Sequence, residues 1–362
     1  MDIAELSTPA LLIDWDQVEA NCRMMSARAK MLGVRLRPHV KTHKCVEIAR
    51  LQVRDHFGGI TVSTMAEART FAAHGFADIT LAVPVAPHRV LEGLGLGVNL
   101  LVDSIEAIAA IEAAAPSAPA GVFLKVDCGY GRAGVLPNTP RAVMLAERLH
   151  RSPFIRFLGL LTHGGHSYDC VDAEAIRRVA QQERDAVVGF ADHLRTIGIP
   201  CLEVSVGSTP TMMHVDHLEG VTEMRPGNYA LFDGFQAAIG SCASEQVAVS
   251  VMGTVVAVHP DRAILDLGAL AMSKDPGPVH VDSECGFGQV LCISGAPLRD
   301  VRLVGLSQEH GKLKGDGVTA LSVGQQVRIV PNHSCLTMAC FGHAHTTSGS
   351  TVTGTITPCR GW

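Results

Sequence analysis

The sequence predicts an α/β protein of two parts, a (β/α)8 TIM-type barrel followed by a C-terminal antiparallel β domain. Its 362 residues exceed a typical small domain and suit one barrel-sized domain plus a smaller one. Up to about residue 233, short β-branched or Leu-rich runs alternate with longer Ala-rich amphipathic segments, which is typical of βα units around a parallel sheet. Beyond that point, β-branched segments are separated by tight turns.

Eight strands are expected in the first part, after an initial helix near residues 16–32. They lie near residues 34–38, 59–63, 78–83, 99–102, 122–127, 157–162, 203–206 and 221–224. Eight parallel strands with intervening helices are the count of a closed barrel, whose ligand site lies at the carboxyl ends of the strands. We therefore assign residues 14–240 to the barrel.

The β domain is expected to comprise residues 1–13 and 241–362. Strands are predicted at 247–258, 263–267 and 326–330, with a turn at 259–262, and the strand-like segment 10–14 is expected to join them. Segments 113–120 and 346–357 are interpreted as loops.

Composition narrows the classes of function. With 47% hydrophobic residues, 18% charged residues and a net charge of -5, the chain lacks the basic excess of nucleic-acid-binding proteins. No apolar run reaches the length of a membrane span, and the N-terminus lacks the order of a secretory signal. The eleven cysteines, without a CxxC pair, indicate reduced thiols. We expect a cytoplasmic protein that acts on a small molecule, with no nucleic-acid or membrane partner.

Lys41 directly follows the first predicted strand, in the segment 37–44. A lysine at that end of a barrel is exposed to ligand and can form a Schiff base with an aldehyde. The alternative is an ordinary solvated lysine. Loops are polar anyway, so polar residues at strand ends carry little weight alone. The others at or just beyond predicted strand ends are Ser63, Asp103, Arg132, His163, Ser208 and Arg225.

Two motifs after the last predicted strands suit a phosphate group. Gly207-Ser208-Thr209-Pro210 supplies backbone N–H groups and two hydroxyls at the expected start of a helix, and Arg225-Pro226-Gly227-Asn228 could complete the same site. Either motif alone is more often a plain helix cap. Since no Walker motif or dinucleotide fingerprint is present, a phosphate site plus a lysine indicates a phosphorylated aldehyde such as pyridoxal 5'-phosphate.

His333 and Cys335 follow the predicted strand at 326–330. Residues two apart in an extended segment project to the same side, so the two could bind one metal. Imidazole with thiolate favours zinc, and two protein ligands leave positions open for water or substrate. Two separately buried residues are the alternative. Further acid–base candidates are His163, His166, Tyr168, Glu309 and His310.

Six motifs, taken in order, resemble the metal-dependent D-serine dehydratase and D-threonine aldolase family of alanine-racemase-like, fold-type III pyridoxal phosphate enzymes. They are residues 38–44 (PHVKTHK), 165–168 (GHSY), 206–210 (VGSTP), 225–229 (RPGNY), 308–311 (QEHG) and 331–335 (PNHSC). The similarity runs nearly end to end, and six motifs in order are far more specific than any one of them.

The resemblance implies a role for each candidate residue. Lys41 would form the Schiff base and, once freed, take the Cα proton, with Tyr168 beside the cofactor. Arg132 matches the racemase arginine near the phenolic oxygen, and Arg225 the arginine that faces the pyridine nitrogen. The implied cofactor-binding set is Lys41, His39, Arg132, His163, Tyr168, Gly207, Ser208, Thr209, Arg225, Gly227 and Asn228, and the implied metal ligands are His333 and Cys335.

The implied activity is dehydration of a D-3-hydroxy amino acid to an enamine that hydrolyses to a 2-oxo acid and ammonia, because the His-x-Cys pair is the dehydratase form and aldolases usually carry His-x-Asp. D-Serine is the preferred substrate because residues 165–168 (GHSY) follow the form of the D-serine dehydratases. The alternatives are D-threo-3-hydroxyaspartate dehydration, D-threonine cleavage to glycine and aldehyde, and a non-catalytic pyridoxal phosphate carrier. The resemblance also implies zinc, with manganese or magnesium as alternatives, and a homodimer.

Overall fold

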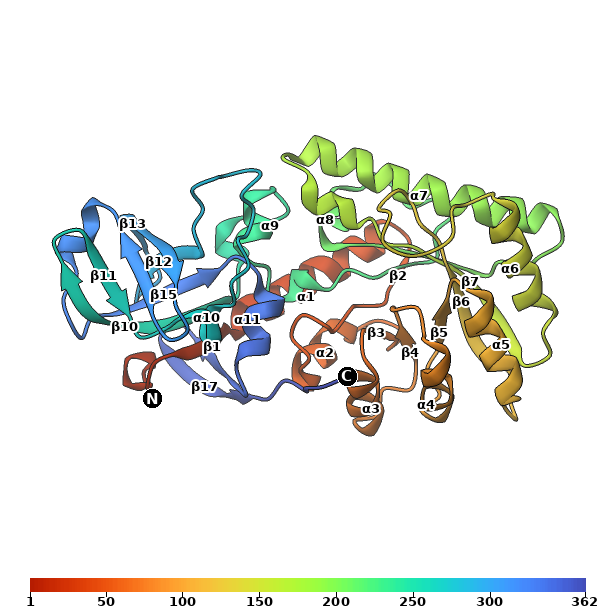
Figure 1. Cartoon of the computed structure of the whole chain (residues 1–362), viewed down its shortest axis with the longest axis horizontal. Coiled ribbons are helices and arrows are strands. Elements are labelled where there is room, and N and C mark those ends of the chain that lie inside the picture. Colours follow the sequence, from red (N-terminus) through yellow and green to blue (C-terminus); the bar gives the residue numbers. More distant parts are fainter. The chain divides into compact units, whose positions relative to one another are not determined.

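Eight parallel strands, each followed by a helix as far as β8, make up the unit of residues 24–227 and 359–362 (Figure 1). The computed structural model describes residues 1–362. The strands are β2 (Arg35–Leu36), β3 (Ile60–Val62), β4 (Ile79–Leu81), β5 (Leu100–Val102), β6 (Ala120–Lys125), β7 (Ile155–Leu161), β8 (Glu203–Val206) and β9 (Glu223–Met224). The main helices are α1 (Trp15–Met31), α2 (Val46–Val53), α3 (Met65–Ala73), α4 (Val90–Gly95), α5 (Ile105–Ala114), α6 (Pro140–Arg151), α7 (Ala173–Thr196) and α8 (Thr209–His214).

These strands pair in parallel. One sheet has the order β2-β9-β8-β7-β6-β5, and β3 pairs with β4. Isolated parallel bridges join His39 to Thr61 and Thr80 to Asn99, so β3 is linked to the end of β2 and β4 to the start of β5. Because all pairings are parallel, the residues that follow the strands emerge at the same edge. All eight predicted strands overlap an observed one.

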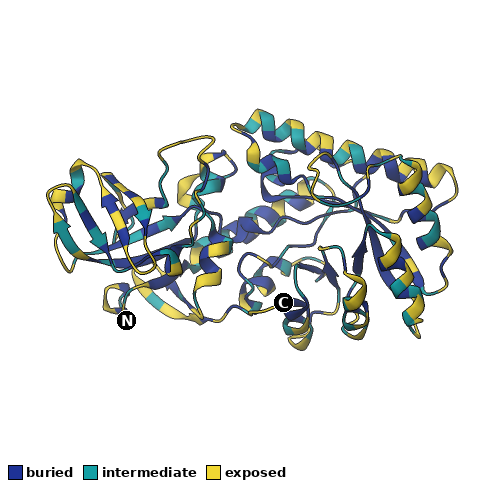
Figure 2. Cartoon of the chain, in the orientation of Figure 1, coloured by how far each residue is buried: buried dark blue, intermediate teal, exposed yellow.

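Apolar strand residues and capped helices explain this unit. Leu101, Phe123 and Leu161, one from each of three neighbouring strands, form a buried cluster, and burial of such side chains contributes about 1.5–3 kcal/mol each. Thr64, Ser104, Thr139, Asp172 and Ser208 each cap a helix by accepting a hydrogen bond from its first turn. Figure 2 shows the strands buried and the helices exposed on one face only.

Residues 1–23 and 228–358 form the second unit, which contains an antiparallel barrel. Its six strands pair in the closed order β10-β11-β14-β13-β12-β15-β10. They are β10 (Val249–His259), β11 (Arg262–Leu265), β12 (Gly288–Cys292), β13 (Pro297–Leu306), β14 (Gly311–Lys314) and β15 (Gln326–Pro331). Three short helices accompany them, α9 (Gly234–Ala238), α10 (Ala269–Met272) and α11 (Ser334–Cys340).

Three further strands extend this sheet from β10. The N-terminal strand β1 (Ala10–Asp14) pairs with β10 and with β16 (Ala344–Ser348), which pairs with β17 (Thr351–Ile356). The prediction of a loop over residues 346–357 is therefore wrong. Its Thr, Ser and Gly content resembles a loop, but β-branched threonines also suit strands, and pairing with the distant β1 decides the outcome.

Membrane helices and disulfides are both absent from the structure. None of the helices combines the length and hydrophobicity needed to cross a bilayer. None of the eleven cysteines forms a disulfide.

Candidate active site and metal pair

Lys41 lies in a turn after β2 that is anchored on both sides. Its N–H donates to His39 Nδ1 at 3.4 Å, and the His39 N–H donates to the carbonyl of Pro226, beyond β9, at 3.0 Å. On the other side, Lys44 Nζ lies 2.7 Å from Oε1 of the buried Glu67. Lys41 itself is exposed. The turn is thus anchored by backbone and side-chain contacts, while the amine of Lys41 is open to a ligand.

Positive charge gathers around Lys41 at the ends of the strands. Lys125 ends β6 and is 5% exposed, and burial together with the charge of Arg225 lowers its pKa to about 7. Arg225 follows β9, and burial lowers its pKa to about 10. Burial and the charge of Lys41 also lower the pKa of His39 and of His163 well below the usual value. Both imidazoles are therefore neutral at pH 7, while Arg225 stays charged.

This donor set fits an anionic cofactor that carries an aldehyde. The charge of Arg132 also reaches Lys125 and His163, so the cations depress one another's protonation. A bound dianion relieves that repulsion, because an opposite charge favours the charged form of each group. An accessible amine on Lys41 is the nucleophile that an aldehyde requires. A phosphorylated aldehyde such as pyridoxal 5'-phosphate meets both conditions.

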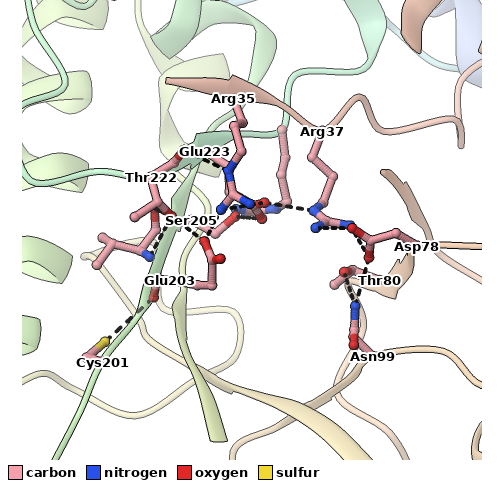
Figure 3. A network of polar contacts seen from close by, with 12 residues as sticks. Arg35, Arg37, Asp78, Thr80, Asn99, Cys201, Glu203, Ser205, Thr222 and Glu223 are labelled. Atoms are coloured by element: carbon pink, nitrogen blue, oxygen red, sulfur yellow. Dashed lines mark hydrogen bonds and ion pairs between the residues drawn. The ribbon is translucent and has the colours of Figure 1, made fainter. Parts of the chain in front are cut away.

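A buried network fixes the guanidinium of Arg225. Its Nη1 donates to Ser205 Oγ at 2.5 Å, and Ser205 Oγ donates to Glu223 Oε1 at 2.6 Å. Arg37 Nε donates to the other oxygen of Glu223 at 2.8 Å and also binds both oxygens of Asp78. Figure 3 shows the part of this network that runs from Ser205 to Asp78. Arg225 is thus a cation with a fixed orientation.

Ser208 caps the start of α8, where the sequence predicted a helix to begin, and its hydroxyl faces two other hydroxyls. Ser208 Oγ accepts from the Thr211 N–H, and Thr211 Oγ1 accepts from the Ser208 N–H at 3.0 Å, which completes a capping box. The Oγ atoms of Ser167 and Ser208 lie 3.0 Å apart. These contacts bring the 3-10 helix η3 (Gly165–Asp169), which carries Tyr168, beside the turn of Ser208 and Thr209.

Gly207 and Gly227 allow a close approach of backbone at this edge. Gly207 has φ +127°, and a Cβ there would lie 2.9 Å from the nitrogen of Arg225. A Cβ on Gly227 would lie 2.5 Å from the carbonyl oxygen of His39. The N–H of Gly207 donates to the buried Glu183 at 3.0 Å. The sequence predicts that the N–H groups of this turn face a phosphate. In the structure the Gly207 N–H instead binds Glu183 and the Ser208 N–H binds Thr211.

Arg132 lies in the exposed loop after β6. Its guanidinium carbon is 5.0 Å from the centre of the Tyr130 ring, a cation–π distance. The Tyr130 ring centre is 6.3 Å from that of His163 and 6.1 Å from that of His166. These ring contacts place the Arg132 loop beside the turn after β7.

His333 and Cys335 meet at the start of α11 in the second unit. His333 precedes the helix and Cys335 is its second residue, so the prediction that both lie in an extended segment is wrong. The helix turn still lets the two side chains hydrogen-bond. Burial alone would lower the pKa of His333, but hydrogen bonds with Asp275 and Cys335 raise it to about 10. Without a metal, a proton occupies the imidazole.

Asp275 fixes which nitrogen of His333 is available. Asp275 Oδ2 lies 2.9 Å from His333 Nδ1, which leaves Nε2 for a metal. Asp275 Oδ1 accepts from the Gly277 N–H at 2.8 Å. No group of three or more His, Cys, Asp or Glu residues is arranged to bind a metal. His333 and Cys335, with Asp275 behind the imidazole, fit a divalent ion as two of its ligands.

The side chain of Asn228 is engaged by this second unit. Its Nδ2 donates to Asp233 Oδ2 at 2.8 Å and lies 2.9 Å from Ser334 Oγ. Asp233 also accepts from the Ser334 N–H, so it ties Asn228 to the first turn of α11. Asn228 Oδ1 is buried without a hydrogen bond. The sequence predicts that Asn228 binds the phosphate. Because its Nδ2 is engaged by Asp233 and Ser334, only other groups of Asn228 could do so.

The remaining candidates have different surroundings. Glu309 and His310 lie in the exposed turn between β13 and β14. Asp103 Oδ2 accepts from the Gly134 N–H at 3.0 Å and serves the loop after β6. Ser63 Oγ lies 3.4 Å from His39 Nε2 and belongs to the Lys41 surroundings.

Sequence reasoning missed Lys125, Glu183 and Asp275. Lys125 had the same signal as Lys41, a lysine at the end of an apolar strand. Glu183 lies on the apolar stripe of α7, between the buried Ala180 and Val187, and a carboxylate at that spacing could have been noticed. Asp275 has no comparable signal, because only the fold brings it to His333.

Comparison with known families and proteins gives a consistent result over both units. The alanine racemase N-terminal domain family matches residues 13–233, and a serine dehydratase domain family matches residues 248–347. D-threo-3-hydroxyaspartate dehydratase of Delftia sp. is 41% identical, with 93% of each chain covered. D-serine dehydratase of Dictyostelium discoideum is 35% identical, covering 95% of this chain and 94% of the relative. D-threonine aldolase of Arthrobacter sp. is 31% identical, covering 91% and 86%.

Solved structures agree. D-threo-3-hydroxyaspartate dehydratase from Delftia sp. superposes with a TM-score of 0.95 at 39% identity over 100% of both chains. A variant of that enzyme with a cysteine replaced by alanine, in the metal-free form, gives the same TM-score, identity and coverage. Alanine racemase of Clostridium difficile, at 17% identity and a TM-score of 0.71 over 97% and 99% of the chains, shares the fold.

Proposed function

We propose that this protein is a D-3-hydroxy amino acid dehydratase. The premise is that the chain belongs to the family that joins an alanine racemase N-terminal domain to a serine dehydratase domain. Loss of water across Cα and Cβ gives an enamine, which takes up water again on hydrolysis, so that the net products are a 2-oxo acid and ammonia. The observation that carries this function is the pair His333 and Cys335, held by Asp275, in a chain that also presents Lys41 among cations. The alanine-racemase-like unit supports pyridoxal 5'-phosphate as cofactor.

The parallel pairings support a closed (β/α)8 barrel as the site of that cofactor. With the two isolated bridges, each strand from β2 to β9 has a neighbour on both sides. A barrel places its ligand at the carboxyl ends of the strands, where Lys41, His163, Ser208 and Arg225 follow β2, β7, β8 and β9.

The candidate residues of the site have defined tasks in the proposal. When bound, the cofactor supplies an electron sink for the Cα–H bond and the metal supplies a Lewis acid for the 3-hydroxyl. Lys41 holds the cofactor and removes the Cα proton. Arg225 would supply a cation to the cofactor ring, the Ser208 hydroxyl would help to hold the phosphate, and Tyr168 would lie near the cofactor.

Two substrates compete within this function. D-Serine is favoured by residues 165–168, and D-threo-3-hydroxyaspartate is the second candidate because the relative named for it is 41% identical. Incubation with D-serine, D-threo-3-hydroxyaspartate and D-threonine should yield 2-oxo acid and ammonia. Glycine and aldehyde as the main products would identify an aldolase, and no turnover of any of the three would favour a carrier of the cofactor.

Asp275 offers a prediction about metal affinity. Substitution Asp275→Asn is expected to weaken metal binding by roughly 10- to 100-fold, because the carboxylate orients His333 and keeps its Nε2 directed at the metal. The dissociation constant is measured by competition with a chromogenic chelator. Asp282→Asn, at an exposed position of the same loop, is the matched control and should bind metal as the unmodified protein does. Equal affinities of both variants would contradict the role of Asp275.

Zinc is the metal that we propose, because imidazole and thiolate are ligands it prefers, with manganese and magnesium as alternatives. A homodimer is the proposed assembly and a cytoplasmic location the proposed compartment. Metal analysis of purified protein tests the identity of the metal, and light scattering tests the homodimer.

A further inference from the structure

Glu183 is a fully buried carboxylate on α7 that connects the turns after two neighbouring strands. Its Oε1 accepts from the Gly164 N–H at 2.6 Å and from the Gly207 N–H at 3.0 Å. Its Oε2 accepts from Thr211 Oγ1 at 2.9 Å. The side chain is 0% exposed. One carboxylate thus binds the turn after β7, the turn after β8 and the first turn of α8.

These hydrogen bonds form a closed arrangement around the candidate phosphate turn. His163 Nδ1 lies 3.0 Å from the carbonyl oxygen of Gly207, so the two turns are linked a second time. Thr211 Oγ1, which donates to Glu183, also accepts from the Ser208 N–H and lies 3.0 Å from Ser208 Oγ. The position of the Ser208 hydroxyl therefore depends on Glu183 through Thr211.

The charge of Glu183 explains why its role is positional. Its negative charge counteracts part of the lowering of the pKa of Lys125 and of Arg225, so it offsets part of the surrounding positive charge. A carboxylate repels a phosphate dianion and cannot bind it. By accepting the Gly207 N–H it instead sets the conformation of the turn and leaves the Ser208 hydroxyl for the anion.

We propose that Glu183 is the positioning residue for the phosphate of the cofactor. It holds the turn of Gly207 and Ser208 in the conformation that receives the phosphate and keeps His163 beside it. The inference rests on the proposed function, because it assumes that pyridoxal 5'-phosphate binds at this edge.

The test compares two ligands that differ only in the phosphate. Affinities of the full chain for pyridoxal 5'-phosphate and for pyridoxal are measured by absorption titration, for the unmodified protein and for Glu183→Ala. The variant leaves two backbone N–H groups without an acceptor, and we expect the affinity for pyridoxal 5'-phosphate to fall about tenfold or more. The affinity for pyridoxal should change much less. Glu174→Ala, at an exposed position of the same helix, is the matched control and should change neither affinity.

Each outcome decides a separate question. Equal losses for the two ligands, or no loss, would overturn the assignment of Glu183. Failure of the unmodified protein to bind pyridoxal 5'-phosphate would instead overturn the proposed function. Should Glu183→Ala not fold, as judged by circular dichroism, Glu183→Asp keeps the charge but is too short to reach both turns. The same selective loss is then expected, and unchanged selectivity refutes the inference.

Discussion

Substitution Lys41→Ala is expected to abolish turnover of D-3-hydroxy amino acids, with kcat falling by about a thousandfold or more. The proposed function gives this lysine two tasks, attachment of the cofactor and removal of the Cα proton, and a positioned base alone contributes roughly 100- to 10,000-fold. Formation of the 2-oxo acid measures the rate. In the unmodified protein, borohydride reduction followed by peptide mapping should locate the cofactor on Lys41.

Lys125 makes this a demanding test, because it too ends a strand and burial lowers its pKa to about 7. A mapped cofactor on Lys125 would transfer the attachment to β6 and contradict the assignment of Lys41. Lys30→Ala, at an exposed position of α1, is the control for the loss of a lysine and should retain full activity. Retained activity in Lys41→Ala would contradict the proposal directly.

Strand periodicity and strand ends made the parallel unit predictable. The run 203–206 was predicted to the residue as β8, and the first helix was placed within one residue of α1. Short apolar runs between longer amphipathic segments have few other interpretations in a chain of this length. The family resemblance taken from six motifs is confirmed by the matches over both units.

The segment 10–14 was expected to join the β domain, and it does so as β1, but other contacts between distant segments were not predicted. The β16–β17 pair resembles a loop until β1 pairs with it, and its partner lies more than 300 residues away along the chain. Asp275 reaches His333 across 58 residues through a loop without regular structure. The helical start at Ser334 was missed because no cap residue marks it, since the position before the helix is His333 itself, whose side chain makes no cap hydrogen bond.

Loss of the metal pair should remove catalysis and leave the cofactor bound. Substitutions His333→Ala and Cys335→Ala, or treatment with a chelator, are expected to lower 2-oxo acid formation by roughly 100-fold or more, because a Lewis acid supplies several kcal/mol to departure of a hydroxyl. The visible absorption of the bound cofactor should persist, because no metal ligand belongs to the unit of Lys41. Activity and spectrum are measured on the same samples.

Cys340→Ala is the matched control, because Cys340 lies exposed at the opposite end of the same helix α11 from Cys335. It should retain activity and bound metal, and zinc should restore activity to chelated, unmodified protein but not to Cys335→Ala. Loss of the cofactor absorption together with activity would show that the metal stabilises the fold instead of acting on the substrate. Full activity without metal would exclude the Lewis acid, because a hydroxyl that leaves unaided needs no cation at His333 and Cys335.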